Sequence, residues 1–161
     1  MRLVRNNLPA IVTLLIVLAF GVFGGTLLTR VGYLAVPSAV GLPYGLPGLR
    51  VTPIGETSWL GTLTDALLAL ALVAMVALTR GGFWRTWGAF LAGAVLVDVV
   101  RAVFLAQDAG TMLGAYAGYL AGGLVTGLIW GIALGWLPAL GALTRRGRSQ
   151  ERSTAGINSM G

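Results

Sequence analysis

Four long apolar stretches with very few charges occupy more than half of this chain. They cover roughly residues 8–28, 59–78, 84–106 and 111–137. Because an α-helix rises about 1.5 Å per residue, roughly 20 apolar residues are needed to span the hydrocarbon core of a bilayer. Charged residues make up only 10% of the chain, against about 25% in a soluble domain. We therefore predict an all-α, polytopic membrane protein with four transmembrane helices.

The arginines predict how these helices are oriented, since cytoplasmic segments carry an excess of basic residues. All eleven basic residues are arginine: two lie before residue 8, two in the 79–85 turn and four after residue 144, whereas the 107–110 turn has none. This distribution places the N- and C-termini in the cytoplasm. Arginine-only basic residues and abundant glycine are typical of a GC-rich bacterial genome, so we expect the bacterial cytoplasmic (inner) membrane.

Two segments outside the apolar stretches differ in character. Residues 29–58 contain four prolines and five glycines, which exclude a regular helix, yet they are too apolar for a disordered linker. We predict one long structured extracytoplasmic loop that lies on the membrane surface, against another protein, or dips back where protein buries it. Residues 1–144 would form the transmembrane domain. Residues 145–161 read as a basic, disordered cytoplasmic tail that contacts anionic lipid headgroups.

The last apolar stretch carries eight glycines at a spacing of four. Residues four apart share a helix face, and small residues at this spacing let membrane helices approach closely. A one-residue step between the two rows rotates the second by about 100°, so we expect the rows to face different neighbours, with the first row beside the buried charges. The first row is Gly110, Gly114, Gly118 and Gly122, and the second is Gly123, Gly127, Gly131 and Gly135.

Apart from Arg85 at the edge of the third stretch, three charged residues lie within the apolar stretches: Asp98 and Arg101 in the third, and Asp65 near the start of the second. Rise per residue puts them at similar depth, where one charge costs about 2.5–3.5 kcal/mol on insertion scales. The functional interpretation is an ion, proton or substrate site, and the structural one, which we prefer, is an ion pair that fixes helix packing. A carboxylate that does not meet Arg101 is expected to be protonated or in contact with water.

Asp65 has a second interpretation. Thr62 and Asp65 have the spacing of a capping box. If the second helix begins at Thr62, Asp65 only caps that helix near the membrane interface.

The amino-acid composition excludes most kinds of catalytic site. The chain has no cysteine, histidine or lysine, so the usual metal, haem and proton-shuttle side chains are missing. We expect no enzymatic activity, no catalytic residues, no metal and no cofactor. The arginines lie mainly at the ends of apolar stretches, where topology requires them, so we expect no nucleic acid partner.

These observations favour a small non-catalytic subunit of a larger bacterial membrane protein complex, docked through the glycine rows and the apolar outer loop. Its partners would be other integral membrane proteins, in a hetero-complex or a homo-oligomer. The alternative is a small homo-oligomeric transporter or channel that uses Asp65, Asp98 and Arg101 along its path. A membrane enzyme ranks third.

Overall fold

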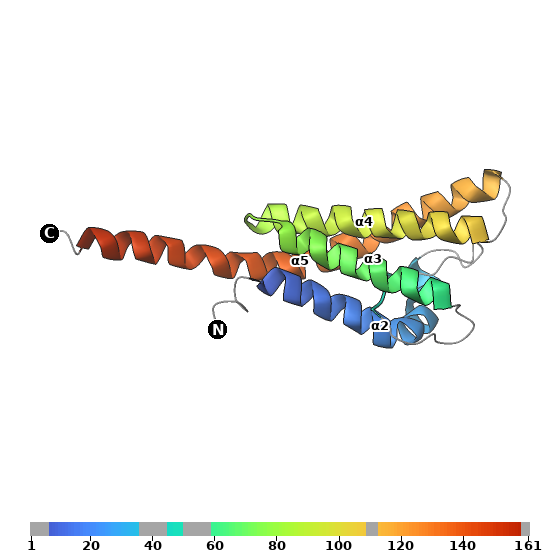
Figure 1. Cartoon of the computed structure of the whole chain (residues 1–161), viewed down its shortest axis with the longest axis horizontal. Helices are drawn as coiled ribbons and strands as arrows, with labels where there is room; N and C mark the ends of the chain where they lie inside the picture. Colours follow the sequence, from blue (N-terminus) through green and yellow to red (C-terminus); the bar gives the residue numbers. More distant parts are fainter. Residues whose placement is uncertain (1–6, 36–44, 50–58, 109–112, 159–161) are drawn as a thin grey trace.

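The computed structural model describes residues 7–35, 45–49, 59–108 and 113–158, which contain four helices and the non-helical segment 45–49. Each helix packs against its neighbours in sequence, and the last closes back on the first, which makes an up-and-down bundle (Figure 1). The chain is therefore all-α, as predicted. The helices are α2 (Leu8–Ala35), α3 (Trp59–Leu78), α4 (Phe83–Asp108) and α5 (Leu113–Asn158).

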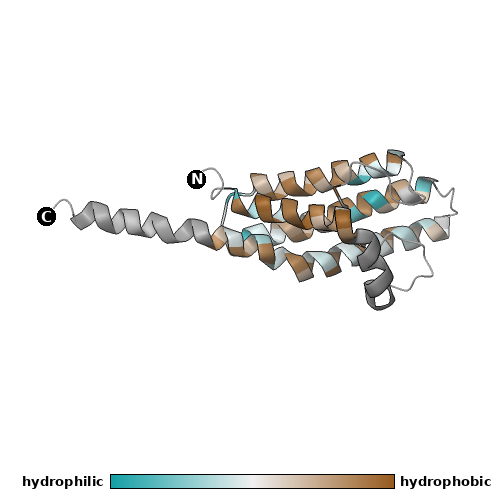
Figure 2. Ribbon diagram, turned by 90° about the horizontal axis from the view of Figure 1, so that it is seen from below, coloured by the Kyte–Doolittle hydropathy of each residue, from teal (hydrophilic) through white to brown (hydrophobic). Residues whose placement is uncertain are grey.

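Three of these helices are long and apolar enough to cross a membrane, over Trp59–Leu78, Phe83–Phe104 and Gly114–Leu143. Helix α2 contributes a shorter apolar stretch, Leu8–Phe23. Apolar residues predominate along the coloured parts of the helices (Figure 2), and many of the large ones are exposed, Leu67 among them. Such a surface suits lipid rather than water, and the three long helices are typical of a multi-pass membrane protein.

Two helices run beyond the predicted stretches. Helix α2 continues to Ala35, because no proline lies between Pro9, in its first turn, and Pro37 to stop it. Helix α5 passes through Pro138 and stays helical to Asn158, whereas the sequence predicts disorder from residue 145. The end of α5 combines Arg, Gln, Glu and Ala, which are good helix formers, and these outweigh its two glycines.

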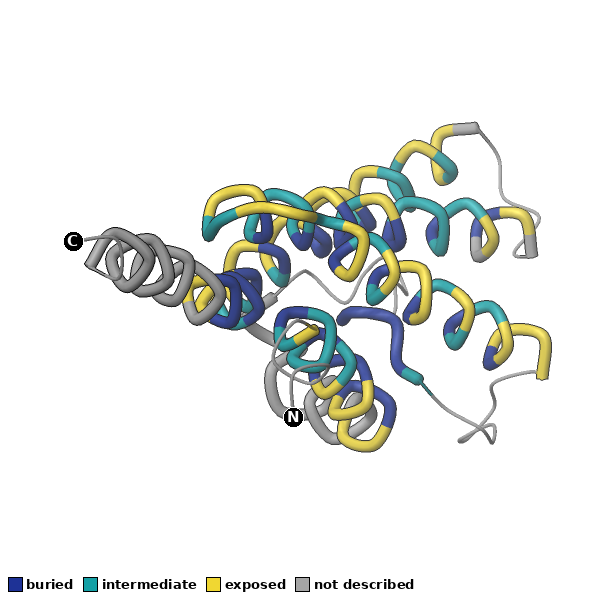
Figure 3. Tube along the Cα trace, turned by 60° about the vertical axis from the view of Figure 1, so that its left-hand side comes forward, coloured by how far each residue is buried: buried dark blue, intermediate teal, exposed yellow. Residues whose placement is uncertain are grey.

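The predicted outer loop is described only over residues 45–49, and residues 36–44 and 50–58 lie outside the described residues. Segment 45–49 is buried beside α2 (Figure 3). The Leu49 N–H donates to the Val17 carbonyl at 3.0 Å. A Cβ at Gly48 would lie 2.7 Å from the Gly21 Cα, so two glycines let this segment rest directly on the α2 backbone.

The second glycine row forms the contact between α4 and α5, the most extensive interface in the bundle. A Cβ at Gly127 would lie 2.6 Å from the Val95 Cα, so the two backbones touch as small-residue spacing allows. Along the interface the pairs are Gly123 with Asp98, Gly127 with Val95, Gly131 with Leu91 and Gly135 with Trp87.

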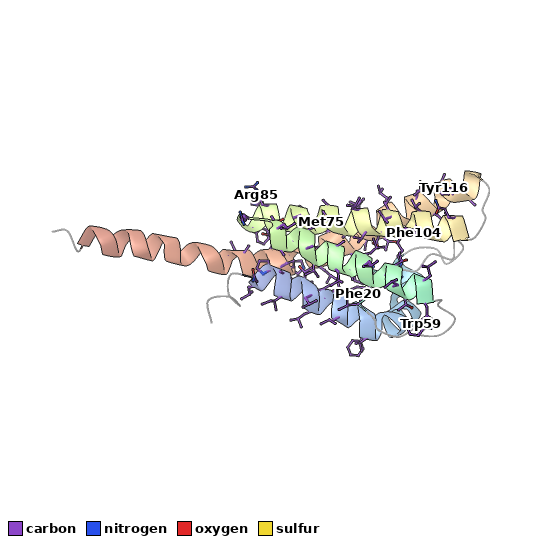
Figure 4. All side chains as sticks on the ribbon, in the orientation of Figure 1. Phe20, Trp59, Met75, Arg85, Phe104 and Tyr116 are labelled. Atoms are coloured by element: carbon purple, nitrogen blue, oxygen red, sulfur yellow. The ribbon has the colours of Figure 1, made fainter. Side chains whose placement is uncertain are left out.

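An aromatic contact joins the first and last helices. Phe20 of α2 meets Trp130 of α5 edge to face, with ring centroids 5.0 Å apart. Figure 4 places Phe20 where α2 meets the rest of the bundle, with Arg85 at the end from which α5 projects and Trp59 and Tyr116 at the other end. Segment 45–49 reaches this core through Leu46, which is 3% exposed.

Candidate functional site

An ion pair joins α3 to α4. Arg101 Nη2 donates to Asp65 Oδ2 at 2.8 Å, and the two side chains are 15% and 12% exposed. Charge-assisted hydrogen bonds of this length are among the stronger polar contacts in proteins. Helix α3 begins at Trp59 rather than at Thr62, so Asp65 lies inside the helix. The interpretation of Asp65 as only a cap is therefore wrong.

Arg101 also holds segment 45–49. Its Nη1 donates to the Gly45 carbonyl oxygen at 3.2 Å. Gly45 has a φ of 143°, a conformation that favours glycine, and a Cβ there would lie 3.0 Å from the Phe20 ring. One guanidinium thus ties together α3, α4 and the segment that rests on α2. The amino-acid sequence does not mark Gly45 as a partner of Arg101, because a backbone carbonyl carries no residue-type signal.

Asp98 lies one turn before Arg101 on α4 but does not share its hydrogen bonds. Asp98 is 4% exposed, and neither carboxyl oxygen has a hydrogen-bond partner among the described residues. The carboxyl is close enough to Arg101 and Asp65 to interact electrostatically with both. The structure thus joins Asp65 to Arg101 and leaves the Asp98 carboxyl buried beside the pair.

The two glycine rows have different surroundings. The second row lies against α4, and its first member, Gly123, contacts the Asp98 backbone. In the first row, a Cβ at Gly114 or Gly118 would meet nothing within 4 Å. Gly122 is half-buried, and Gly110 lies outside the described residues. We call Gly114 and Gly118 the open glycine face. The second row, and not the open glycine face, touches a residue of the charged cluster.

One further polar atom in the core lacks a hydrogen bond. The Trp130 Nε1–H is buried with no partner in the described part of the chain, beside the Phe20 ring. Across the described ranges, no group of three or more His, Cys, Asp or Glu side chains is placed to hold a metal ion. The charged cluster itself consists of two carboxyls and one guanidinium, which can form an ion pair and exchange a proton.

Comparison of this chain with known protein families, with curated proteins and with solved structures gave no match.

Proposed function

We propose that this protein is a small non-catalytic subunit of a bacterial membrane protein complex and that it docks on another integral membrane protein through the open glycine face. The observation behind this proposal is the contrast between the two glycine rows. Both have the spacing that suits close helix contact. One is covered by α4, whereas a Cβ added at Gly114 or Gly118 would meet nothing within 4 Å.

The energetics of glycine support a partner at this face. Glycine in a helix is less favourable than alanine by about 1 kcal/mol, and it offers lipid little surface for dispersion contacts. Close packing by a second helix offsets both losses, as α4 does at Gly127. Within this chain the described residues supply no such contact at Gly114 or Gly118. A helix from another membrane protein, with small residues of its own, would supply it.

Cysteine cross-linking tests this docking face. The chain has no cysteine, so a Gly118→Cys variant carries a single reactive thiol. In native membranes a short bifunctional reagent should join this thiol to another membrane protein in one adduct of fixed mass, identified by mass spectrometry. The matched control is Leu70→Cys on the exposed face of α3, which should give no adduct. An adduct containing only a second copy of this chain would contradict the hetero-complex.

We propose further that all four helices span the cytoplasmic membrane, with both termini in the cytoplasm, and that segment 45–49 enters the bundle from the outer side. The arginine distribution supports this orientation. So does Figure 1, in which α2 begins, α3 turns into α4 and α5 projects at one end of the bundle. An impermeant thiol reagent should label Gly110→Cys in intact spheroplasts and Gly161→Cys only after permeabilisation. The reverse pattern would overturn this orientation.

The second candidate is a small homo-oligomeric transporter or channel. The observation that favours it is the buried Asp98 carboxyl, which has no hydrogen-bond partner among the described residues, because intramembrane carboxyls often mark ion or proton paths. In proteoliposomes, Asp98→Asn should then abolish solute or proton flux while the oligomer stays intact. Equal flux in the variant and the wild type would exclude this candidate.

A further inference from the structure

We propose that Asp98 is a reversible proton-binding site, and that release of its proton transfers Arg101 from Asp65 and Gly45 to Asp98. This inference goes beyond docking and does not require a partner protein. It rests on three features of the described residues: the charge balance of the cluster, the burial of Asp98, and the two bonds that Arg101 already makes.

Charge balance is the first step. Two carboxyls share one guanidinium, and that guanidinium pairs with Asp65 at 2.8 Å. Asp98 is 4% exposed and has no hydrogen bond in the described part of the chain. An ionised carboxylate is strongly unfavourable in an apolar interior without a counter-charge or a donor. A proton on Asp98 makes the cluster neutral and needs neither a cavity nor further ligands.

Groups from α3, α4 and α5 surround Asp98. Helix α3 presents Asp65, and α4 itself presents Arg101. Helix α5 packs on Asp98 through Gly123, and its sequence has no titratable residue between Leu120 and Leu143. The Leu8–Phe23 stretch of α2 has none either. Among these facing groups, Arg101 is the cation that can receive an ionised Asp98.

The third step is the transfer of Arg101. Residues three apart on a helix are neighbours, and a guanidinium has five donors on a long side chain. When the Asp98 O–H bond breaks, both electrons stay on the carboxylate and the proton leaves to water. Arg101 then turns towards Asp98. The bond from Nη1 to the neutral Gly45 carbonyl is the longer of its two, at 3.2 Å, and is given up first.

Loss of the Arg101 bond would loosen the Gly45 end of segment 45–49, while the Leu49 N–H still holds the other end to Val17. Water that enters at the loosened end then solvates the ionised cluster. Asp98 protonation and the position of segment 45–49 are thus coupled: the protonated form keeps the segment in the core, and the ionised form releases it.

Infrared spectroscopy of the full chain in lipid vesicles tests proton binding. A protonated carboxyl has a C=O stretching band that a carboxylate lacks, and the chain has only five Asp and Glu side chains. At neutral pH, where exposed carboxyls are ionised, the wild type should show this band. Asp98→Asn should lose it, and Glu151→Gln, in the tail, should keep it. Absence of the band in the wild type, or its survival in Asp98→Asn, would overturn the proposal.

The Asp65→Asn variant tests whether Arg101 controls the protonation of Asp98, which a purely structural role of Asp98 would not require. This variant frees Arg101 from its carboxylate partner, so Arg101 can pair with Asp98 and displace the proton. The carboxyl band should therefore disappear at neutral pH although Asp98 is still present. Persistence of the band in Asp65→Asn would mean that Arg101 does not control the Asp98 proton, which contradicts the transfer step.

The coupling to segment 45–49 is tested with Leu46→Cys, a buried position. The rate at which an impermeant thiol reagent labels Leu46→Cys is divided by the rate for Trp59→Cys, an exposed position. This ratio cancels the intrinsic pH dependence of thiol labelling. The ratio should rise several-fold as pH increases over the range in which the carboxyl band is lost. It should stay flat in a Leu46→Cys and Asp98→Asn double variant. A flat ratio in both would overturn the coupling.

Discussion

Where α5 crosses Val95 of α4, glycine brings two helix backbones into contact, whereas a Cβ added at Gly118, nearer the start of α5, would meet nothing within 4 Å. Around Val95, the bundle is stabilised by apolar surfaces that pack at van der Waals distance. The other half contains the charged cluster, in which Arg101 bonds to Asp65 and to the Gly45 carbonyl. The same glycine spacing occurs in both halves. The spacing therefore permits close helix packing but does not determine which helix packs there.

The two halves should therefore respond differently to substitution. Close packing fails when atoms are added, since a dense interface has no room for another methyl group. A polar cluster fails when one partner is removed, since the other is left buried without compensation. The free energy of unfolding of single variants in mixed micelles measures this contrast.

Arg101→Ala should have the largest effect. It leaves the Asp65 carboxylate without its guanidinium and the Gly45 carbonyl without its donor, and removal of one member of a buried ion pair costs about 3–5 kcal/mol. Arg101→Lys is the matched control, since it keeps the charge and should lose less. A loss below about 1 kcal/mol for Arg101→Ala would mean that the pair behaves like one on a solvated surface.

Gly127→Ala should come second, with a loss of about 1–3 kcal/mol from overpacking. The added methyl group would lie 2.6 Å from the Val95 Cα and 2.9 Å from the Ala94 carbonyl oxygen. Both are backbone atoms, so neither can move without shifting α4. An unchanged free energy of unfolding would show that α4 and α5 do not approach as closely as the structure indicates.

Gly135→Ala should be milder. Here the new methyl group would lie 3.1 Å from the Trp87 ring and 3.2 Å from the Phe90 ring, which are side chains that can move slightly. The gain in helix propensity, about 1 kcal/mol, offsets much of the strain. We expect a net change within about 1 kcal/mol of zero, clearly smaller than that of Gly127→Ala. Equal losses at the two positions would remove the distinction between backbone and side-chain contact.

Gly118→Ala should have the smallest effect and the opposite sign. Nothing lies within 4 Å of the new methyl group, so the purified chain should gain up to about 1 kcal/mol from helix propensity alone. A loss as large as that of Gly127→Ala would show that this part of α5 packs inside the chain. That result would also remove the observation behind the docking proposal.

Much of the fold follows from the length of the apolar stretches, because a bilayer admits helices and fixes how long they are. Helix ends were harder to predict. Turn residues in the predicted loop suggested an end at residue 28, yet α2 continues to Ala35. Pro138 suggested a kink or an end, yet α5 continues through it. At such places the local sequence allows both outcomes, and tertiary packing decides between them.

The sequence identifies the three residues of the charged cluster, but it does not predict which of them form hydrogen bonds with one another. Asp98 is the nearest carboxyl to Arg101 along the chain, but Arg101 pairs with Asp65, 36 residues away. Which neighbour a guanidinium reaches depends on how α3 and α4 are rotated against each other, and helical periodicity does not fix that rotation. The Gly45 contact lies still further away, at a separation of 56 residues, and its acceptor is a backbone atom.

The contact between Gly21 and Gly48 has a consequence for biogenesis. Segment 45–49 rests on a helix that is synthesised before it, so the Leu49–Val17 bond joins residues that leave the ribosome close together in time. Its bond to Arg101 must wait until α3 and most of α4 have been made. The shorter loop is also the easier one to close. We therefore expect segment 45–49 to pack on α2 as an early unit, which Arg101 of α4 secures only later in synthesis.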